Sequence, residues 1–144
     1  NYELIASEND RVFDYENRIY RPFMTDQLLL KQLMTILFDN AIKYTEEDGK
    51  IEFVVYATDR HLYLTVTDNG IGISAADKKK IFDRFYRVDK ARTRQKGGFG
   101  LGLSLAKQIV DALRGTISVK DNKPRGTIFE VKIAIQSPSK RRNK

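Results

Sequence analysis

Asp68-Asn69-Gly70-Ile71-Gly72-Ile73 and Gly97-Gly98-Phe99-Gly100-Leu101-Gly102-Leu103 are the two stretches that decide the fold of this chain. They contain six of its nine glycines. Glycine has no Cβ, so a ligand can approach its backbone closely, and bare N–H groups ahead of a helix form an anion site. The first stretch carries an acid at the end of an apolar run, and the second leads into a helical pattern. Together they predict a nucleotide that is held at both ends.

The size and composition indicate one globular domain. The 144 residues are enough to bury a core, no apolar run is long enough to span a bilayer, and the absence of cysteine excludes disulfides and thiolate metal sites. Asn1 is not a natural initiator, so we expect the chain to be a piece of a longer protein. We expect residues 1–137 to form the domain and the basic tail 138–144 to be disordered.

The net charge of +7 is unevenly placed. Apart from the basic tail, much of the excess lies between residues 84 and 96, between the two glycine-rich stretches. A basic balance can indicate nucleic-acid binding. The local placement favours a phosphate-rich small ligand instead.

Hydrophobic periodicity predicts the order of the elements. Two short strands or one hairpin are expected at 2–8 and 11–20, and a long helix with Thr25 or Asp26 as its N-cap runs to Thr45. The remaining expected elements are strands 51–57 and 61–67, a short helix from Ser74 to about Phe82, a helix over 101–113 with Leu101, Leu105, Ile109 and Ala112 on one face, and strands 116–120 and 127–135. This order predicts an α+β fold, a two-layer α/β sandwich with a mixed, mostly antiparallel sheet and about three helices on one face.

The long helix brings Asn40, Lys43 and Tyr44 together on one face, because they are three and four positions apart. Taken alone, Asn40 would be interpreted as a solvated helix residue. It lies close to the apolar stripe, however, and an amide oxygen is a good ligand for Mg²⁺. In that case Lys43 could meet a phosphate, and Tyr44 could flank a base as well as pack in the core.

Asp68 follows a predicted strand of alternating apolar and polar residues, and its role has two interpretations. Asp-Asn-Gly is a strong turn signal, so it can be a residue that ends the strand. Alternatively, its carboxylate accepts a hydrogen bond from an exocyclic amine, which adenine has and guanine lacks at that ring position. Gly70 and Gly72 would let the base edge lie close to the backbone.

The segment between the glycine-rich stretches is predicted to be a lid. Residues 83–96 hold six cations against two acids, and Phe82, Phe85 and Tyr86 would anchor the start of the segment to the core. A charge run is usually a solvated face, but arginine is well shaped to clamp phosphate oxygens. The second glycine-rich stretch matches neither a P-loop nor the dinucleotide-binding fingerprint.

Four elements in this order resemble the catalytic ATP-binding domain of bacterial sensor histidine kinases, which belong to the Bergerat-fold group. Residues 37–45 (LFDNAIKYT) resemble the N box of that family, and 68–73 (DNGIGI) its first glycine box. Residues 81–89 (IFDRFYRVD) resemble its F box, and 98–103 (GFGLGL) its second glycine box. The resemblance covers roughly 25–135, with 126–129 (GTIF) similar to the closing strand.

The resemblance implies roles by position, with ATP and Mg²⁺ as the ligands. Asn40 would bind Mg²⁺, Lys43 would contact phosphate, and Tyr44 would pack on adenine. Asp68 would accept from the adenine amino group, assisted through water by Gly72 and Thr127. The other implied nucleotide-binding residues are Gly70, Ile73, Arg87, Arg92, Gly98, Gly100, Leu101, Gly102 and Leu103; among all of these, Asn40, Lys43 and Arg87 are the expected catalytic residues.

Two positions depart from the family pattern. Ile36 stands where members often carry an asparagine and related ATPases a glutamate general base, so we expect poor intrinsic hydrolysis. Phe99 replaces a threonine common in the second glycine box. The single histidine, His61, lacks the sequence context of a phosphoacceptor, so the acceptor is expected upstream of Asn1.

The resemblance therefore implies a protein-histidine kinase domain on the cytoplasmic side of a membrane sensor. Its partners would be its own dimerisation and histidine-acceptor domain and a cognate response regulator. A Bergerat ATPase of the chaperone or DNA-repair kind, a nucleotide-binding regulatory module without phosphotransfer, and a nucleic-acid-binding protein are the alternatives.

Overall fold

The computed structural model describes residues 2–8, 10–20, 22–84, 86 and 102–136. The predictions made for residues 87–101, which include most of the expected lid, and for the tail 138–144 lie outside this part of the chain. None of the helices in the described ranges is long and apolar enough to cross a membrane.

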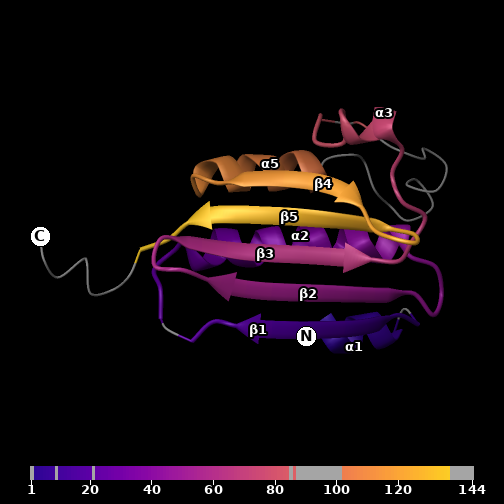
Figure 1. Cartoon of the computed structure of the whole chain (residues 1–144), viewed down its shortest axis with the longest axis horizontal. Coiled ribbons are helices and arrows are strands. Elements are labelled where there is room, and N and C mark those ends of the chain that lie inside the picture. The colour runs from indigo at the N-terminus through magenta and orange to yellow at the C-terminus, as the bar shows by residue number, and fades with distance from the viewer. Residues whose placement is uncertain (1, 9, 21, 85, 87–101, 137–144) are drawn as a thin grey trace, which may run out of the picture.

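The described residues form a five-stranded sheet with the spatial order β1-β2-β3-β5-β4 (Figure 1). The strands are β1 (Val12–Arg18), β2 (Lys50–Ala57), β3 (His61–Asp68), β4 (Thr116–Asp121) and β5 (Thr127–Ala134). β1 pairs with β2 in parallel, and the other three pairings are antiparallel. The register places Asp68, the last residue of β3, between Ile51 and Thr127.

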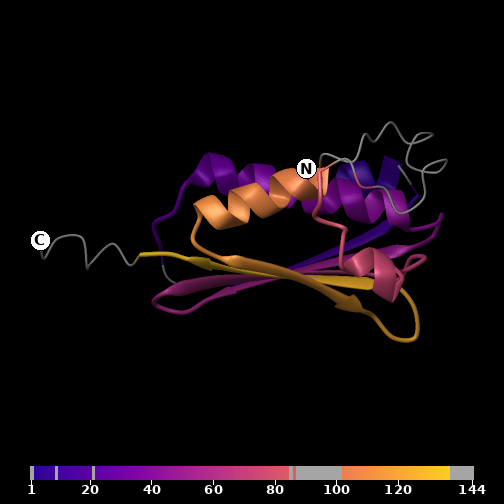
Figure 2. The same cartoon turned by 90° about the horizontal axis from the view of Figure 1, so that it is seen from above.

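Three helices, α1 (Tyr2–Glu8), α2 (Gln27–Tyr44) and α5 (Gly102–Ala112), cover one face of the sheet and leave the other face open (Figure 2). The side chain of Asp26 caps α2 by accepting a hydrogen bond from the Leu29 amide at 3.0 Å. The short helix α3 (Ala75–Lys78) begins at the predicted position, with Ser74 as its N-cap, whose Oγ accepts from the Asp77 amide at 3.1 Å. This arrangement confirms the predicted two-layer α+β fold with a mixed sheet.

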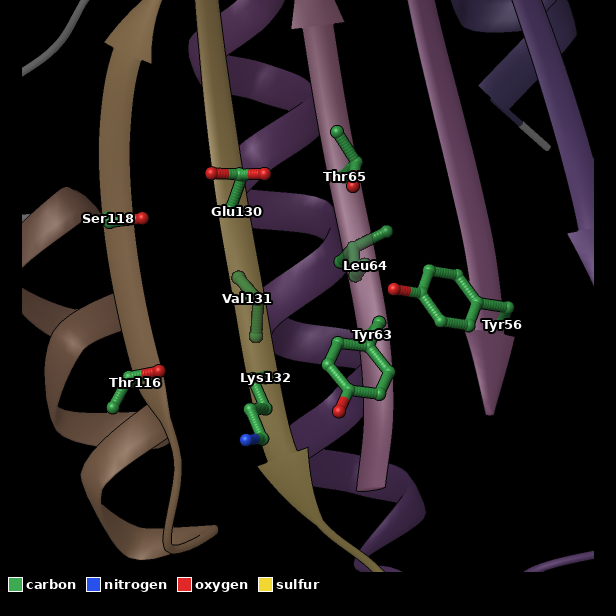
Figure 3. A pocket seen from close by; sticks show the side chains of 9 residues that line it. All are labelled: Tyr56, Tyr63, Leu64, Thr65, Thr116, Ser118, Glu130, Val131 and Lys132. Carbon is green, nitrogen blue, oxygen red and sulfur yellow. The ribbon is translucent and has the colours of Figure 1, made fainter. Parts of the chain in front are cut away.

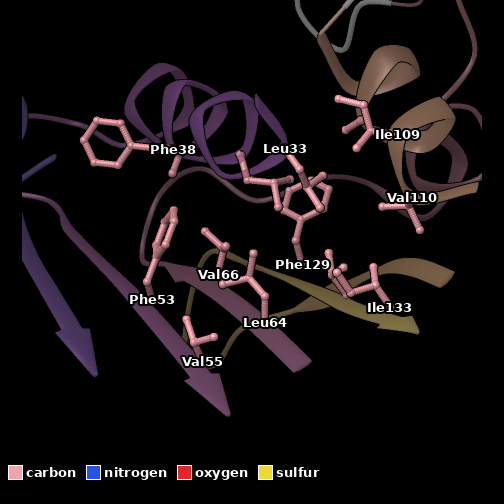
Figure 4. Close-up of a cluster of buried hydrophobic side chains, with 14 of the residues drawn as sticks. Leu33, Phe38, Phe53, Val55, Leu64, Val66, Ile109, Val110, Phe129 and Ile133 are labelled. Atoms are coloured by element: carbon pink, nitrogen blue, oxygen red, sulfur yellow. The ribbon is translucent and has the colours of Figure 1, made fainter. Parts of the chain in front are cut away.

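The core lies between the helices and the sheet (Figure 4). Alternate residues of β2, β3 and β5 point to the helices, because successive side chains of a strand face opposite sides. Large side chains with almost no exposure fill this layer: Leu33, Leu37, Phe38, Ile51, Phe53, Val66, Val110, Phe129 and Ile133. The core therefore fixes α2 and the strand ends against one another.

The N-terminal segment corrects one prediction, because residues 2–8 form a helix and not a strand. The ring of Tyr2 stacks on Phe38 with centroids 4.6 Å apart and also contacts Phe13 and Phe53. Ala6, one helical turn later, is fully buried. These contacts to residues distant in sequence outweigh the weak local alternation, which is typical of short segments.

β1 also differs from the predicted hairpin. It pairs in parallel with β2, and α2 forms the connection between the two strands. A parallel pair needs such a crossover connection, whereas a hairpin turn joins antiparallel strands only.

The buried face of α5 differs from the predicted one. Ala106, Ile109 and Val110 are buried, but Leu105 is 45% exposed. The observed face is shifted by about one residue because α5 packs on both α2 and β4, and two neighbours require a broader buried stripe. The short helix α3 also ends earlier than expected, at Lys78.

The aromatic cluster gives a stability prediction. Phe38→Ala removes a fully buried ring that contacts Tyr2, Phe13 and Phe53, so the free energy of unfolding should fall by about 3–5 kcal/mol. Tyr20→Ala is the control, because Tyr20 is 87% exposed and should change stability by less than about 0.5 kcal/mol. Urea unfolding of both variants checks this, and equal losses would contradict the placement of the core.

Candidate functional site

A buried carboxylate lies at the end of β3. Asp68 is only 2% exposed, and its Oδ1 accepts hydrogen bonds from the Gly70 amide at 2.9 Å and the Thr127 amide at 3.3 Å. Both donors lie on the loop and strand that flank this acid, so they fix the orientation of the carboxylate. Asp68 Oδ1 is thus committed to the backbone.

Burial raises the pKa of Asp68 above its ordinary value. The amides of Gly70 and Thr127 favour the charged form and act in the opposite direction, but they do not cancel the desolvation. A carboxylate in this state gains from any further hydrogen-bond donor. Asp68 is therefore suited to a ligand that carries an N–H group.

The backbone around Asp68 is packed so closely that side chains are excluded. A Cβ on Gly70 would lie 1.9 Å from the carbonyl oxygen of Tyr44, and one on Gly126 would lie 1.9 Å from that of Asp68. Gly126 also has a φ of +112° and Gly72 a φ of +78°, which L side chains rarely adopt. These glycines allow the loop after β3, the end of α2 and the start of β5 to meet.

Thr127 faces the same interior as Asp68, with which it is paired in the sheet. Its Oγ1 is buried and has no hydrogen-bond partner among the described residues. A buried hydroxyl without a partner costs free energy, which a bound ligand or a water can recover. Asp68 and Thr127 are thus a polar pair with unused hydrogen-bonding capacity.

The three candidates on α2 occupy the C-terminal half of that helix. Asn40 and Tyr44 are buried, and Lys43 is half-buried. Desolvation raises the pKa of Asp39 above its ordinary value, and the nearby ammonium of Lys43 partly opposes this shift. The main chain of Tyr44 is linked directly to the acid-bearing loop, because its carbonyl accepts from the Ile71 amide at 3.0 Å.

The start of α5 lies beside the same helix. A Cβ on Gly102 would be 3.7 Å from Ile36 Cγ2, which places the end of the second glycine-rich stretch next to the position that departs from the family pattern. Ile73 is buried, and Leu103 packs partly buried on the core. The other predicted ligand contacts, Arg87, Arg92, Gly98, Gly100 and Leu101, lie outside the described residues.

Two asparagines and a glycine complete the site and were not predicted. Asn122 Nδ2 donates to the Asp68 carbonyl at 2.9 Å, and Asn69 Oδ1 accepts from the Lys50 amide at 2.8 Å. In the sequence, Gly126 belongs to the stretch 126–129 (GTIF) that resembles the closing strand of the family, without a predicted role of its own. The available signal was the run of turn-forming residues 121–126, because its Asn and Gly are typical of backbone positions with special geometry.

A separate hollow lies on the open face of the sheet (Figure 3). The rings of Tyr56 and Tyr63 stack there with centroids 4.6 Å apart, and Lys132 Nζ lies 5.8 Å from the centre of the Tyr63 ring. Strand side chains alternate between faces, so these residues point away from Asp68. The hollow is therefore not part of the candidate site.

Comparison with known proteins places this chain in a family. Residues 25–137 match the family described as histidine kinase-, DNA gyrase B-, and HSP90-like ATPases. The chain is 82% identical over 142 residues to the sensor protein CiaH of Streptococcus pneumoniae serotype 4, covering 99% of this chain and 32% of CiaH. It is 45% identical over 101 residues to the histidine-protein kinase ArlS of Staphylococcus aureus USA300, covering 70% of this chain and 22% of ArlS.

A solved structure gives the same result for the fold. The mycobacterial sensor histidine kinase MprB aligns with a TM-score of 0.75 and 26% identity, covering 94% of this chain and 90% of that one. The chain thus spans about a third or less of the curated relatives, but nearly the whole of this solved domain.

The close approach at Gly70 gives a prediction. In Gly70→Ala the added methyl would overlap the Tyr44 carbonyl, so the free energy of unfolding should fall by about 2–3 kcal/mol. Gly102→Ala is the matched control, because its Cβ meets only ordinary contact and alanine favours a helix by up to about 1 kcal/mol. Chemical denaturation of both variants is the measurement, and a neutral Gly70→Ala would contradict the described packing.

The raised pKa of Asp68 gives a second prediction, for the ligand-free chain. An acid whose folded pKa is raised contributes stability below its ordinary pKa, 3.8, and loses it as the pH rises through the folded value. Asp68→Asn keeps the accepting oxygen but does not titrate. The stability of Asp68→Asn relative to wild type should therefore increase from pH 3.5 toward pH 7.

Urea unfolding of both proteins across this pH range is the measurement. A difference that stays constant, or that shrinks as the pH rises, would mean that the carboxylate is not destabilised by burial.

Proposed function

The chain belongs to the histidine kinase-, DNA gyrase B-, and HSP90-like ATPase family, and we propose that it binds ATP with Mg²⁺ as the kinase domain of a sensor histidine kinase. In this proposal the γ-phosphoryl group of ATP passes to a nitrogen of an acceptor histidine, ADP leaves, and the phosphoryl group then passes to a response regulator. The relatives CiaH, a sensor protein, and ArlS, a histidine-protein kinase, support this reading.

The observation that carries the proposal is the buried pair Asp68 and Thr127. Asp68 has a carboxylate that gains from another donor, and the Thr127 hydroxyl has no partner among the described residues. The amino group of adenine supplies that donor, whereas guanine presents a carbonyl at the same ring position. The pair therefore favours adenine nucleotides by the penalty for an unpaired buried group.

The phosphate end is assigned to α2 and to the second glycine-rich stretch. The described residues hold no group of three or more His, Asp or Glu side chains placed to bind a metal ion. Mg²⁺ at nucleotide sites is commonly held by one or two protein oxygens together with phosphates and water, and the buried amide of Asn40 fits this role. Lys43, one turn away, would contact the phosphates, while Arg87, Arg92 and the glycines 98, 100 and 102 stay predictions.

Catalysis in this proposal consists of positioning and charge stabilisation. Phosphoryl transfer needs little covalent chemistry from the protein, so the aligned phosphates and the incoming nitrogen account for most of the rate. Ile36 cannot activate water, and it packs beside Gly102 at the start of α5. This feature favours a kinase over an ATPase of the chaperone or DNA-repair kind.

The acceptor histidine is proposed to come from another segment. His61 begins β3 and Asp68 ends it, so the two lie about 23 Å apart at the usual rise of a strand. Because CiaH and ArlS are much longer than this chain, we place the dimerisation and acceptor domain, and the membrane anchor of the sensor, in such additional segments. The ATP-binding domain formed by this chain would then act on the cytoplasmic side.

Asp68→Asn should weaken ATP binding by about 10- to 100-fold, because a charged acceptor is replaced by an amide whose NH₂ group faces the adenine amine. Isothermal titration with Mg·ATP gives the Kd, and circular dichroism confirms that the variant is folded. GTP is the matched control ligand and should bind weakly to both proteins. Unchanged affinity for ATP in Asp68→Asn would remove the assigned role of this residue.

Asn40→Ala should abolish most of the phosphorylation of an acceptor domain supplied in trans with Mg·ATP. Asn17→Ala is the control, since the Asn17 side chain accepts a hydrogen bond from the nearby Ile19 amide at 2.8 Å and Asn17 lies toward the end of β1 that is far from Asp68. Radiolabel transfer to the acceptor histidine is the measurement. Equal labelling by wild type and Asn40→Ala would contradict the role of Asn40.

A further inference from the structure

The C-terminal end of α2 is held by a residue that is 31 to 34 positions away in the sequence. Helix ends leave their last carbonyls without helical partners, so each needs another donor. Ala41 O accepts from the Thr45 amide at 3.1 Å and from Thr45 Oγ1 at 2.9 Å. The carbonyls of Ile42 and Thr45 accept from Nη2 of Arg11, and the carbonyl of Tyr44 accepts from the Ile71 amide.

Arg11 makes several contacts with this end of α2. Its Nε donates to Thr45 Oγ1 at 3.0 Å, and its Nη2 donates to the Thr45 carbonyl and, at 3.3 Å, to the Ile42 carbonyl. The partners lie 31 to 34 residues away in the sequence. Only a planar guanidinium presents donors in this fork, and its positive charge also suits the negative end of the helix dipole.

The backbone that carries Arg11 is itself fixed to the segment after α2. The Asp48 amide donates to the Asp10 carbonyl at 2.7 Å, and the Val12 amide donates to the Gly49 carbonyl at 2.8 Å. The Arg11 amide donates to Ala6 in α1 at 2.8 Å. Arg11 therefore reaches the helix end from a backbone position that has little freedom to shift.

The same helix end supports the loop that follows Asp68. Tyr44 O receives the Ile71 amide at 3.0 Å and stands where a Cβ on Gly70 would be. Ile42 and Thr45, whose carbonyls accept from Arg11, lie in the same helical turn as Tyr44. Asn40 and Lys43 lie within the last two turns of the same helix. A shift of this turn therefore moves the Mg²⁺ and phosphate candidates and the support of the adenine loop together.

We propose that Arg11 is a positioning residue for nucleotide binding, which acts by holding the last turn of α2 against the adenine loop. Arg11 itself is not proposed to contact the nucleotide. The inference rests on the proposed ATP binding and assigns a further residue to that site. It also links α1, through the α1–β1 junction, to the affinity for nucleotide.

Arg11→Gln removes the guanidinium fork, and we expect the Kd for Mg·ATP to rise on the order of tenfold, since small shifts of supporting groups are costly at such sites. Arg11→Lys keeps the charge without the fork and should give an intermediate Kd. Arg18→Gln, at the opposite end of β1 from Arg11, is the matched control, because Arg18 forms an exposed ion pair with Glu16 and should leave the Kd unchanged. Titrations use the folded 144-residue chain, with the free energy of unfolding measured alongside.

Hydrogen exchange at the Ile71 amide is the second readout, because this amide reports directly on its bond to Tyr44. It should exchange faster in Arg11→Gln than in wild type and Arg18→Gln, by more than the loss of global stability accounts for. A Thr45→Val change combined with Arg11→Gln should show strong coupling in both readouts.

A folded Arg11→Gln variant with wild-type Kd and wild-type exchange at Ile71 would overturn the proposal and leave Arg11 a stabilising residue only. If wild type itself fails to bind Mg·ATP, the proposed function falls. The exchange measurement still decides whether Arg11 holds this turn.

Discussion

The burial of the Asp68 carboxylate is the constraint on which the site depends. A charge with 2% exposure is tolerated only because the amides of Gly70 and Thr127 point at one of its oxygens. The backbone can come this close to the carboxylate because Gly70 and Gly126 have no side chains. The glycines of this region thus allow a buried acid, and the acid gives the site its preference for a donor.

The sheet register extends this constraint across the domain. Asp68 is paired with Ile51 and Thr127, so a slip of one residue would turn the acid to the open face of the sheet. The hydrophobic alternation of β2, β3 and β5 prevents such a slip, because it would also expose Phe53, Val66 and Phe129. Packing of the core and polarity of the site are therefore specified by the same alternation, and α2 meets them at its C-terminal turn.

The sequence was sufficient to predict the helices and strands whose signals are local. The period of α2, the alternation of β2 and β3, and the helix start at Ser74 are local signals that predicted elements the structure confirms. The order of motifs also predicted the family. Local signals failed for α1, where contacts of the Tyr2 ring with the buried rings of Phe38 and Phe53 override a weak alternation. They also failed for Leu105, whose exposure depends on how α5 packs on α2 and β4.

Arg11 shows why part of the site was beyond prediction. The guanidinium bonds to Ile42 and Thr45 reach across 31 to 34 residues, and an arginine next to a strand is ordinarily solvated. Asn122 and Gly126 were hidden for the same reason, since their contacts to Asp68 form only when β3 and β5 pair. The residues proposed to bind the ligand were predicted from motifs, whereas the residues proposed to hold them in place were found only from contacts.

The most direct test of the account is the pKa of the Asp68 carboxyl, followed by NMR in the free chain and with Mg·ATP bound. Burial predicts a pKa above 3.8 in the free chain. A hydrogen bond from the adenine amino group stabilises the carboxylate, so the pKa should fall when Mg·ATP binds and should not fall in this way with Mg·GTP. A pKa that does not change on ATP binding would contradict the central claim that this buried acid recognises adenine.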